Sequence, residues 1–202
     1  MFARSTARIL ASLLLVSLGS GCHTPRATPV APPVSGALEH LRELQPTDVA
    51  VAPVRDQTDA QRVPVDVFRN AFMQTLIERR YSPLAPSYVD SNWIEASFKG
   101  TPPPDVLLVV SVTAWDATHL YSTGKVTAKG DAVLFEGGDT TGQVLWRVSL
   151  DQVIDMGDGR GNPPAAGQDL IPTVVRQLAQ KALQSLPMRD PVAARDSGEA
   201  AE

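Results

Sequence analysis

Residues 105–118 read DVLLVVSVTAWDAT, and this stretch decides the fold of the chain. Successive side chains of a strand point to opposite faces of a sheet. One face would carry Val106, Leu108, Val110 and Val112, and the other would carry Leu107, Val109 and Trp115. A strand that is apolar on both faces is typical of the centre of a sheet. The stretch therefore predicts a long central strand.

Two further strands are expected after it, and together the three form an antiparallel meander. In residues 125–135 apolar side chains alternate with polar ones, which predicts a strand with one wet face. Residues 137–142, GGDTTG, predict a turn, and the alternation resumes from Val144 to Leu150. Apolar residues at every second position, Trp146 among them, point to a core beneath this meander.

Two short strands and two helices are expected before the central strand. The strands cover 48–54 and 81–84, and the first ends near Pro53, which cannot donate to a central ladder. One helix is expected to open at Pro64, and the other covers 86–98. The apolar stripe of the first helix consists of Val65, Phe68, Phe72 and Leu76, with Arg69 placed largely off the stripe. We interpret this stripe as part of the hydrophobic core; the alternative is a groove that binds a partner protein.

A final helix completes the fold. Asp169 is its expected N-cap, Pro172 is tolerated in its first turn, and its buried stripe is expected to run from Leu170 to Ala182. The element order is β-α-β-α-β-β-β-α. It predicts an α+β (α/β two-layer) fold, a mixed sheet with a C-terminal antiparallel meander and helices packed on it. One domain over residues 46–187 is expected, since about 140 residues suffice for a single core.

The N-terminus carries the features of an exported lipoprotein. Residues 1–21 have a basic start, a short apolar core and small residues, in the order of a secretory signal peptide. Cys22, the only cysteine, follows directly and predicts lipidation of its thiol, although Gly19 stands where a lipobox usually has the large apolar residue. An ordinary signal peptide with a stray cysteine, or a short membrane anchor, is the alternative. Because residue 23 is His and not Asp, the sorting convention of enteric bacteria predicts the outer membrane.

The segments flanking the domain are polar. Residues 22–45 are expected to hold the lipidated Cys22, a proline-rich spacer and a short helix over 35–45. Residues 188–202 are small and acidic and predict a disordered tail. After removal of residues 1–21, 16 basic and 22 acidic residues remain, a formal charge of −6 without blocks of like charge. This balance argues against nucleic acid as a partner.

No constellation in the sequence predicts catalysis, a cofactor or a metal site. Asp116 and His119 at the end of the central strand lack further ligands, and no serine lies in a G-x-S-x-G elbow. The glycine-rich stretch 157–162, GDGRGN, lacks the lysine and hydroxyl of a phosphate loop. Asp155, Asp158 and Asn162 do not follow the EF-hand order, so the loop 155–168 is expected to be a flexible surface loop. Trp93, Trp115 and Trp146 are expected in the core rather than as ligand platforms.

Several short motifs together resemble a known family. They are the lipobox at Cys22, VAVAPV at 49–54, RYSPLAP at 80–86, YVD at 88–90, DVLLVV at 105–110, GQVLW at 142–146 and the Gly/Asn loop before the last helix. With these the chain resembles the neisserial-type outer-membrane lipoproteins. That group is similar in fold to the N-terminal domain of TolB and to the periplasmic domain of CsgG. The family often has a paired proline and an asparagine where this chain has 53–56, and usually a glycine where it has Arg80.

The resemblance implies a non-enzymatic envelope lipoprotein that binds other proteins. It would be a lipid-anchored accessory or adaptor for a secretion or cell-wall assembly complex. Acyl chains on Cys22 would hold the protein in the outer membrane, on the periplasmic face in preference to the cell surface. The resemblance is also compatible with an oligomeric protein. The alternative is a periplasmic small-ligand binder, or an enzyme whose site is assembled from residues distant in sequence. A deep pocket with convergent polar groups would favour this alternative, and a flat surface with an apolar patch would favour the adaptor.

Overall fold

The computed structural model describes residues 35–58, 63–156 and 169–190, all within one unit of the chain, Ala31–Glu202. The second unit, Met1–Val30, lies outside the described residues. The expectations for the signal peptide, Cys22 and the proline-rich spacer therefore fall outside them. The expectations for most of the glycine-rich loop, including Asp158 and Asn162, and for the tail beyond Asp190 also lie outside the described residues.

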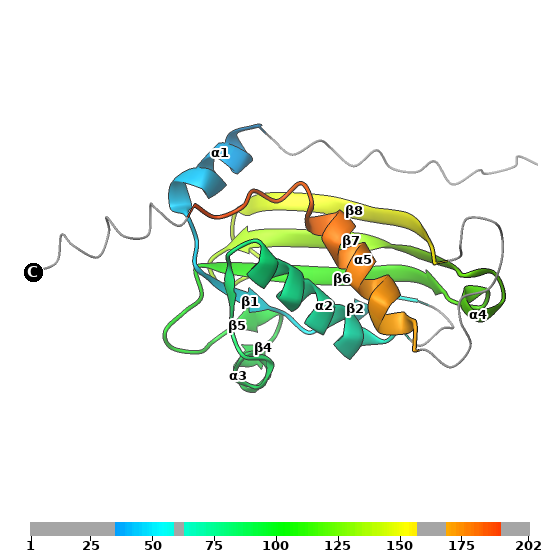
Figure 1. Ribbon diagram of the computed structural model, residues 1–202. Helices are drawn as coiled ribbons and strands as arrows, with labels where there is room; N and C mark the ends of the chain where they lie inside the picture. The colour runs from blue at the N-terminus through cyan, green and yellow to red at the C-terminus, as the bar shows by residue number, and fades with distance from the viewer. Residues whose placement is uncertain (1–34, 59–62, 157–168, 191–202) are drawn as a thin grey trace, which may run out of the picture. The chain divides into compact units, whose positions relative to one another are not determined.

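A mixed sheet of strand order β3-β1-β6-β7-β8 forms the centre of the molecule (Figure 1). β1 (Asp48–Val51) runs parallel to both β3 (Ser82–Pro83) and β6 (Val106–Asp116). β7 (Lys125–Glu136) and β8 (Val144–Asp155) continue from β6 as an antiparallel meander. The predicted fold class and the central position of the 105–118 stretch are confirmed.

The predicted strand over 48–54 is split in two. β1 ends at Val51, and β2 (Arg55–Asp56) pairs again with β6, in parallel, at Ser111 and Val112. Pro53 lies in the gap between the two strands. Because proline has no backbone N–H to donate, it interrupts the ladder at this point.

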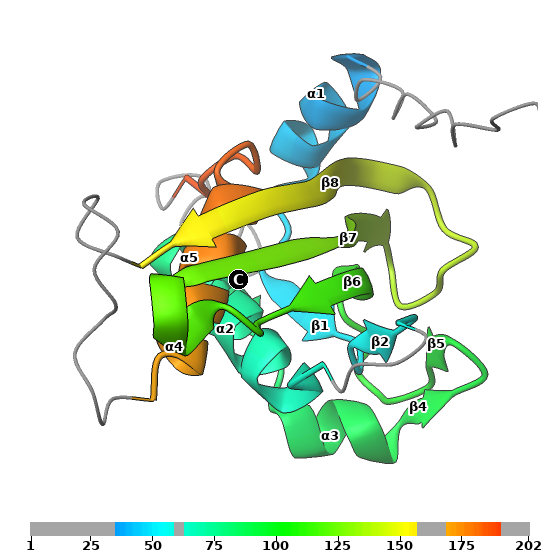
Figure 2. The same cartoon turned by 90° about the vertical axis from the view of Figure 1, so that its right-hand side faces the viewer.

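One face of the sheet is covered by two helices, α2 (Val65–Glu78) and α5 (Ile171–Leu183), which also contact each other (Figures 1 and 2). Phe68, Phe72 and Leu76 of the predicted stripe are fully buried against the sheet, and Val65 is half-buried. The ring of Phe68 meets that of Trp115 edge-on, with centroids 5.3 Å apart. Trp146 is also buried, and its indole nitrogen donates to Ser185 Oγ at 3.1 Å. The expected core positions of Trp115 and Trp146 are thus confirmed.

A smaller apolar cluster lies on the opposite face of the sheet, beneath α3 (Pro86–Ser91). A hairpin of β4 (Trp93–Ile94) and β5 (Ser97–Phe98) follows α3. The predicted helix over 86–98 is therefore wrong beyond Ser91. Glu95 and Ala96 have φ of 49° and 64°, and two successive residues with positive φ make the tight turn of a two-residue hairpin. Neither is Asn or Gly, so the sequence carries no signal of this turn.

The cluster covers only part of that face. It consists of Ala50, Ala52, Val89, Phe98, Leu107 and Val109. Further along the sheet, the outward side chains of β8 are exposed, including those of Arg147 and Asp151, and Val153 is 59% exposed. Part of this face, over β8, is therefore without a covering layer in the part of the chain that the structure describes. We call it the open face.

Gly130 permits a β-bulge in the centre of the sheet. The β6–β7 register shifts between Val112 and Ala114, and Gly130 pairs with Val112 just before the shift. A Cβ atom on Gly130 would lie 2.0 Å from the carbonyl oxygen of Ser111. Only glycine therefore fits where the bulged strand approaches its neighbour so closely.

Both ends of the described domain contact the sheet or its helices. The predicted short helix forms α1 (Ser35–Leu44), which packs beside β8 with Leu41 buried. A four-residue helix, α4 (Leu120–Thr123), joins β6 to β7.

α5 has Pro172 in its first turn as predicted, but its N-cap position is Leu170. Asp169 instead accepts a hydrogen bond from the amide of Ile171. Arg189, predicted to lie in the tail, donates to the carbonyl oxygen of Gln45.

Candidate functional site

The acidic and imidazole groups considered as ligands do not converge. Asp116 and His119 are both exposed, and Asp116 accepts a hydrogen bond from the amide of Thr118 at 2.9 Å. Hydrogen bonds from Thr118 hold the pKa of Asp116 below its ordinary value. His40 lies elsewhere, with Nε2 3.3 Å from Glu136 Oε2. Among residues 35–58, 63–156 and 169–190, no three His, Cys, Asp or Glu side chains group as metal ligands would.

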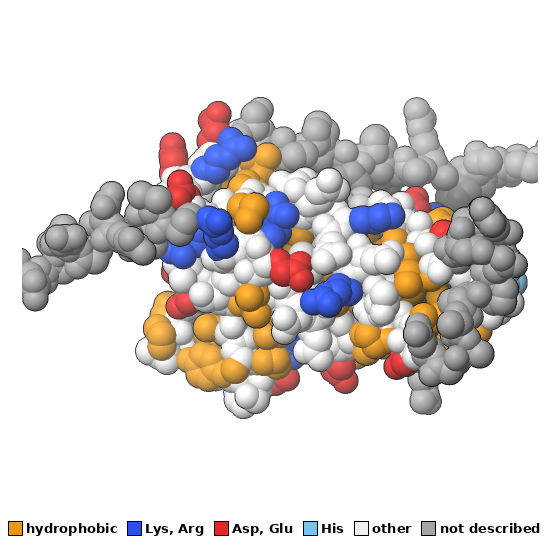
Figure 3. Space-filling view, in the orientation of Figure 1, with side chains coloured by type: hydrophobic (Ala, Val, Ile, Leu, Met, Phe, Trp, Pro, Cys, Tyr) orange, Lys and Arg blue, Asp and Glu red, His pale blue; other side chains and the backbone are white. Residues whose placement is uncertain are grey.

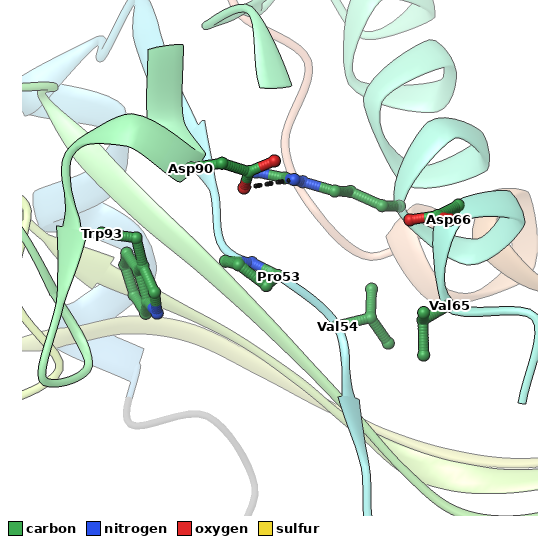
Figure 4. A pocket seen from close by; sticks show the side chains of 7 residues that line it. Pro53, Val54, Val65, Asp66, Asp90 and Trp93 are labelled. Carbon is green, nitrogen blue, oxygen red and sulfur yellow. Dashed lines mark hydrogen bonds and ion pairs between the residues drawn. The ribbon is translucent and has the colours of Figure 1, made fainter. Parts of the chain in front are cut away.

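A cavity of about 270 Å³ lies where β1 leads into β2, beside the start of α2 (Figure 4). It is lined by Pro53, Val54, Val65, Asp66, Arg69, Asp90 and Trp93. Trp93, expected in the core, is only half-buried and forms part of this wall. With aromatic, apolar and charged groups together, this cavity is where a small ligand would bind if the domain had one.

Two of the three charged groups of this cavity, Arg69 and Asp90, satisfy each other. Arg69 is 6% exposed and donates to the carbonyl oxygen of Val51 through Nε (3.1 Å) and Nη2 (2.8 Å). Its Nη1 pairs with Asp90 Oδ1 at 2.6 Å, the contact drawn in Figure 4. Arg69 thereby links α2 to β1 and α3. We interpret it as a structural tie rather than a ligand-binding group.

Sequence reasoning missed Arg69 by placing it off the helix stripe. It lies four residues after Val65 and three before Phe72, a spacing that belongs to the buried side of a helix. The spacing was a signal that it would be buried. Its partner could not be identified in this way, because Asp90 is on a different helix, 21 residues further along the chain.

A second hollow, of about 320 Å³, lies on the open face. It is lined by Arg55, Gln57, Val109, Ser111, Asp131, Val133, Phe135, Thr140 and Arg147. Val109 and Val133 are buried, Phe135 is half-buried, and Arg55 and Arg147 are exposed. Residues of β2, β6, β7 and β8 and of the turn before β8 contribute to it, so the hollow exists only once the sheet has formed. We call it the sheet hollow.

The arginines of the sheet hollow are not used by the fold. Asp131 accepts a hydrogen bond from Ser149 Oγ at 2.9 Å, and Lys129 pairs with Asp151 at 3.6 Å. Within the described residues, by contrast, the side chains of Arg55 and Arg147 form no hydrogen bond or ion pair. Two guanidinium groups therefore remain available to a ligand at the rim of an apolar floor.

A third hollow, of about 480 Å³, lies between α2 and α5, on the face seen in Figure 3. It is lined by Val67, Asn70, Ala71, Gln74, Pro172, Thr173 and Arg176. Its one charged side chain, Arg176, pairs with Glu78 at 3.4 Å. Figure 3 shows polar, charged and hydrophobic side chains intermixed on this face. The apolar stripe of α2 is buried core, so it does not form a partner groove here.

Comparison with known proteins gives only distant structural similarity. No family model and no curated protein matches the chain. Among solved structures, the PelC dodecamer from Paraburkholderia phytofirmans is 16% identical with a TM-score of 0.44, over 71% of this chain and 90% of that one. Lipoprotein GNA1162 from Neisseria meningitidis is 16% identical with a TM-score of 0.44, over 70% and 99%. The LpoB C-terminal domain from Salmonella enterica is 12% identical with a TM-score of 0.38, over 60% and 98%. At such identities these similarities carry no argument about function.

Proposed function

We propose that this protein is a non-enzymatic lipoprotein that binds other envelope proteins through the open face of its sheet. It is anchored in the outer membrane by acyl chains on Cys22 and acts as an accessory to a secretion or cell-wall assembly complex. The motifs quoted for the neisserial-type lipoproteins with a TolB- or CsgG-like domain support membership of that family as part of this proposal. The periplasmic face of the membrane is the proposed side.

The observation that carries the proposal is the uneven covering of the sheet. α2 and α5 cover one face completely enough to bury Trp146, Leu150 and Ile154 of β8. On the other face, α3 and its hairpin stop short, and Val153 of the same strand is 59% exposed. One face of an antiparallel sheet can be exposed to water, and the side chains on that face are then mostly polar. Here that side also holds an apolar-floored hollow with unpaired cations, which is typical of a binding surface.

The rival function is a small-ligand site at the cavity beside Arg69. That cavity brings charged groups and an indole together, but Arg69 and Asp90 already bind each other and the backbone of β1. A ligand there would have to compete with these contacts. The open face offers groups without such partners, and we therefore favour protein binding.

Site-specific photo-crosslinking in native membranes tests the proposal. A photoreactive side chain replaces Val153 on the open face or, as a matched control, Ile77 on α2, which is 52% exposed. We expect a discrete, reproducible crosslinked protein from position 153 and none from position 77. Equal crosslinking from both positions, or none from position 153, would contradict protein binding by the open face.

A further inference from the structure

We propose that the sheet hollow binds an acidic segment of a partner protein, with carboxylates on Arg55 and Arg147 and an apolar side chain on the floor between them. This inference rests on the proposed function for the open face and names the chemistry of the partner. Neither the cavity beside Arg69 nor the hollow between α2 and α5 combines unpaired cations with an apolar floor.

The positive charge of the sheet hollow favours an acidic ligand. The hollow has two arginines and one carboxylate, that of Asp131, so its local charge is positive in a chain of net charge −4. Asp131 is hydrogen-bonded to Ser149, whereas the guanidinium groups of Arg55 and Arg147 have no partner among the described residues. A guanidinium fits a carboxylate with two parallel hydrogen bonds, and such charge-assisted pairs are stronger than neutral ones.

The apolar floor of the sheet hollow favours a partner segment with an apolar residue between its two acidic residues. Val109 pairs with Val133 across β6 and β7, and Val133 pairs with Arg147 on β8. Phe135 lies two residues further along β7 on the same face as Val133. An apolar side chain placed on these groups would be removed from water, which stabilises a complex.

The spacing of the arginines fits an extended segment that crosses the strands. β2 and β8 are separated by β6 and β7, and the register places Arg55 in line with Ser149, two residues along β8 from Arg147. Three strand spacings and this two-residue offset put the Cα atoms of Arg55 and Arg147 about 16 Å apart, and their long side chains can reach inward across the difference from an extended segment. In an extended chain, side chains at i, i+2 and i+4 share one face, and positions i and i+4 are about 13 Å apart. The fitting pattern is therefore acidic at i and i+4 and apolar at i+2.

A direct binding experiment uses a fluorescent peptide with the core Glu-Ser-Leu-Ser-Glu between glycines and the full chain in detergent. The neutral peptide with Gln in place of both Glu is the ligand control. The variants are Arg55→Gln, Arg147→Gln and their double, and Lys129→Gln is the matched protein control because Lys129 lies on the same face but pairs with Asp151. All three positions are exposed, so thermal unfolding should show little change in fold stability.

We expect saturable binding of the acidic peptide, about tenfold weaker with each arginine variant and about unchanged with Lys129→Gln. The neutral peptide lacks both carboxylates, so its binding should be weakened about as much as binding of the acidic peptide to the double arginine variant. Equal binding of both peptides, or no effect of the arginine variants, would overturn the inference. So would displacement of the peptide by citrate at equal concentration, which would indicate a small-anion site.

The crosslinking experiment separates this inference from the proposed function. If the partner crosslinked from position 153 persists in the double arginine variant, the protein-binding function stands and the acidic-segment inference fails. If peptide binding depends on both arginines but position 153 captures no partner, the proposed function fails and the inference holds for the hollow alone. Loss of the crosslinked partner in the double variant, with retention in Lys129→Gln, supports both.

Discussion

Arg80 is an exposed arginine in a backbone conformation that favours glycine. It follows α2 with φ of 72°, its amide donates to the carbonyl of Ile77, and the amide of Tyr81 donates to that of Leu76. These two hydrogen bonds form a Schellman motif, whose left-handed position is usually glycine. Arg80 is also one of the positions at which the sequence departs from the neisserial-type lipoproteins that it resembles, which usually have glycine here.

Replacing Arg80 by Gly should stabilise the domain. The left-handed conformation costs a non-glycine residue about 1–2 kcal/mol, part of which is offset because glycine makes the unfolded chain more flexible. We expect the free energy of unfolding in urea to rise by about 0.5–1 kcal/mol. Arg80→Ala is the control, because it removes the same side chain but keeps the strain. A stabilisation by alanine equal to that by glycine would contradict the backbone explanation.

Tyr81 should make stability fall in alkaline solution. The side chain is buried and its hydroxyl donates to the carbonyl of Pro187 at 2.9 Å. Burial raises the pKa of Tyr81 from 10.0 to about 12, although the charges of Arg79 and Arg189 work in the opposite direction. The folded state thus holds the phenolic proton more tightly than the unfolded state. The stabilisation is complete below the unfolded pKa of 10.0 and is lost as pH rises through the folded pKa of about 12.

The Tyr81→Phe variant should lose that part of the pH dependence. At neutral pH we expect it to be less stable by about 1 kcal/mol, because the hydrogen bond to Pro187 is gone. Chemical unfolding measured from neutral pH upward would compare it with wild type and with Tyr121→Phe, whose ring is exposed. An unchanged alkaline slope in Tyr81→Phe would show that Tyr81 is not the group responsible.

At the scale of elements, the side chain of Arg69 connects α2 with β1 and α3. Arg69 on α2 binds the end of β1 through Val51 and binds α3 through Asp90. Arg69 is 6% exposed, while the side chain of Asp90 is 50% exposed. Removing the carboxylate would leave a buried guanidinium charge without its counter-charge, which is more damaging than losing an exposed pair.

We expect Asp90→Asn to destabilise the domain by about 2 kcal/mol, less than for a fully buried pair because Asp90 is half-exposed. The matched control is Glu78→Gln, which breaks the pair with Arg176 between two exposed side chains. That change should cost less than about 0.5 kcal/mol. Urea unfolding of both variants measures the difference. Equal losses would mean that the Arg69–Asp90 pair is no more than a surface contact.

At the scale of the whole molecule, the proposed function depends on the anchor. The Cys22→Ala variant should move the protein from the membrane fraction to the soluble fraction while the domain stays folded, because two or more acyl chains are needed for stable anchoring. Ser20→Ala, two residues earlier, is the control. Membrane fractionation, intact mass and circular dichroism measure the outcome. Unchanged membrane retention together with no acyl mass on the wild type would contradict lipidation.

None of the helices that the structure describes is both long enough and apolar enough to cross a membrane.

The sequence by itself determined the sheet's central strand, the meander and the positions of the two covering helices. Their signal is periodicity, which is a local property: a period of two in 105–118, 125–135 and 144–150, and a helical period at Phe68, Phe72 and Leu76. Strands and helices with apolar faces bury them by packing helices on a sheet, so the fold class followed from these patterns.

Only the tertiary structure decided which polar residues matter. The tight turn at Glu95 and Ala96 carries no glycine or asparagine, and Arg69 is buried only because the backbone of β1 and Asp90 lie within reach of it. The sheet hollow joins residues from Arg55 to Arg147 that are distant along the chain. Their proximity depends on strand order and register, which long-range packing sets and local periodicity does not encode.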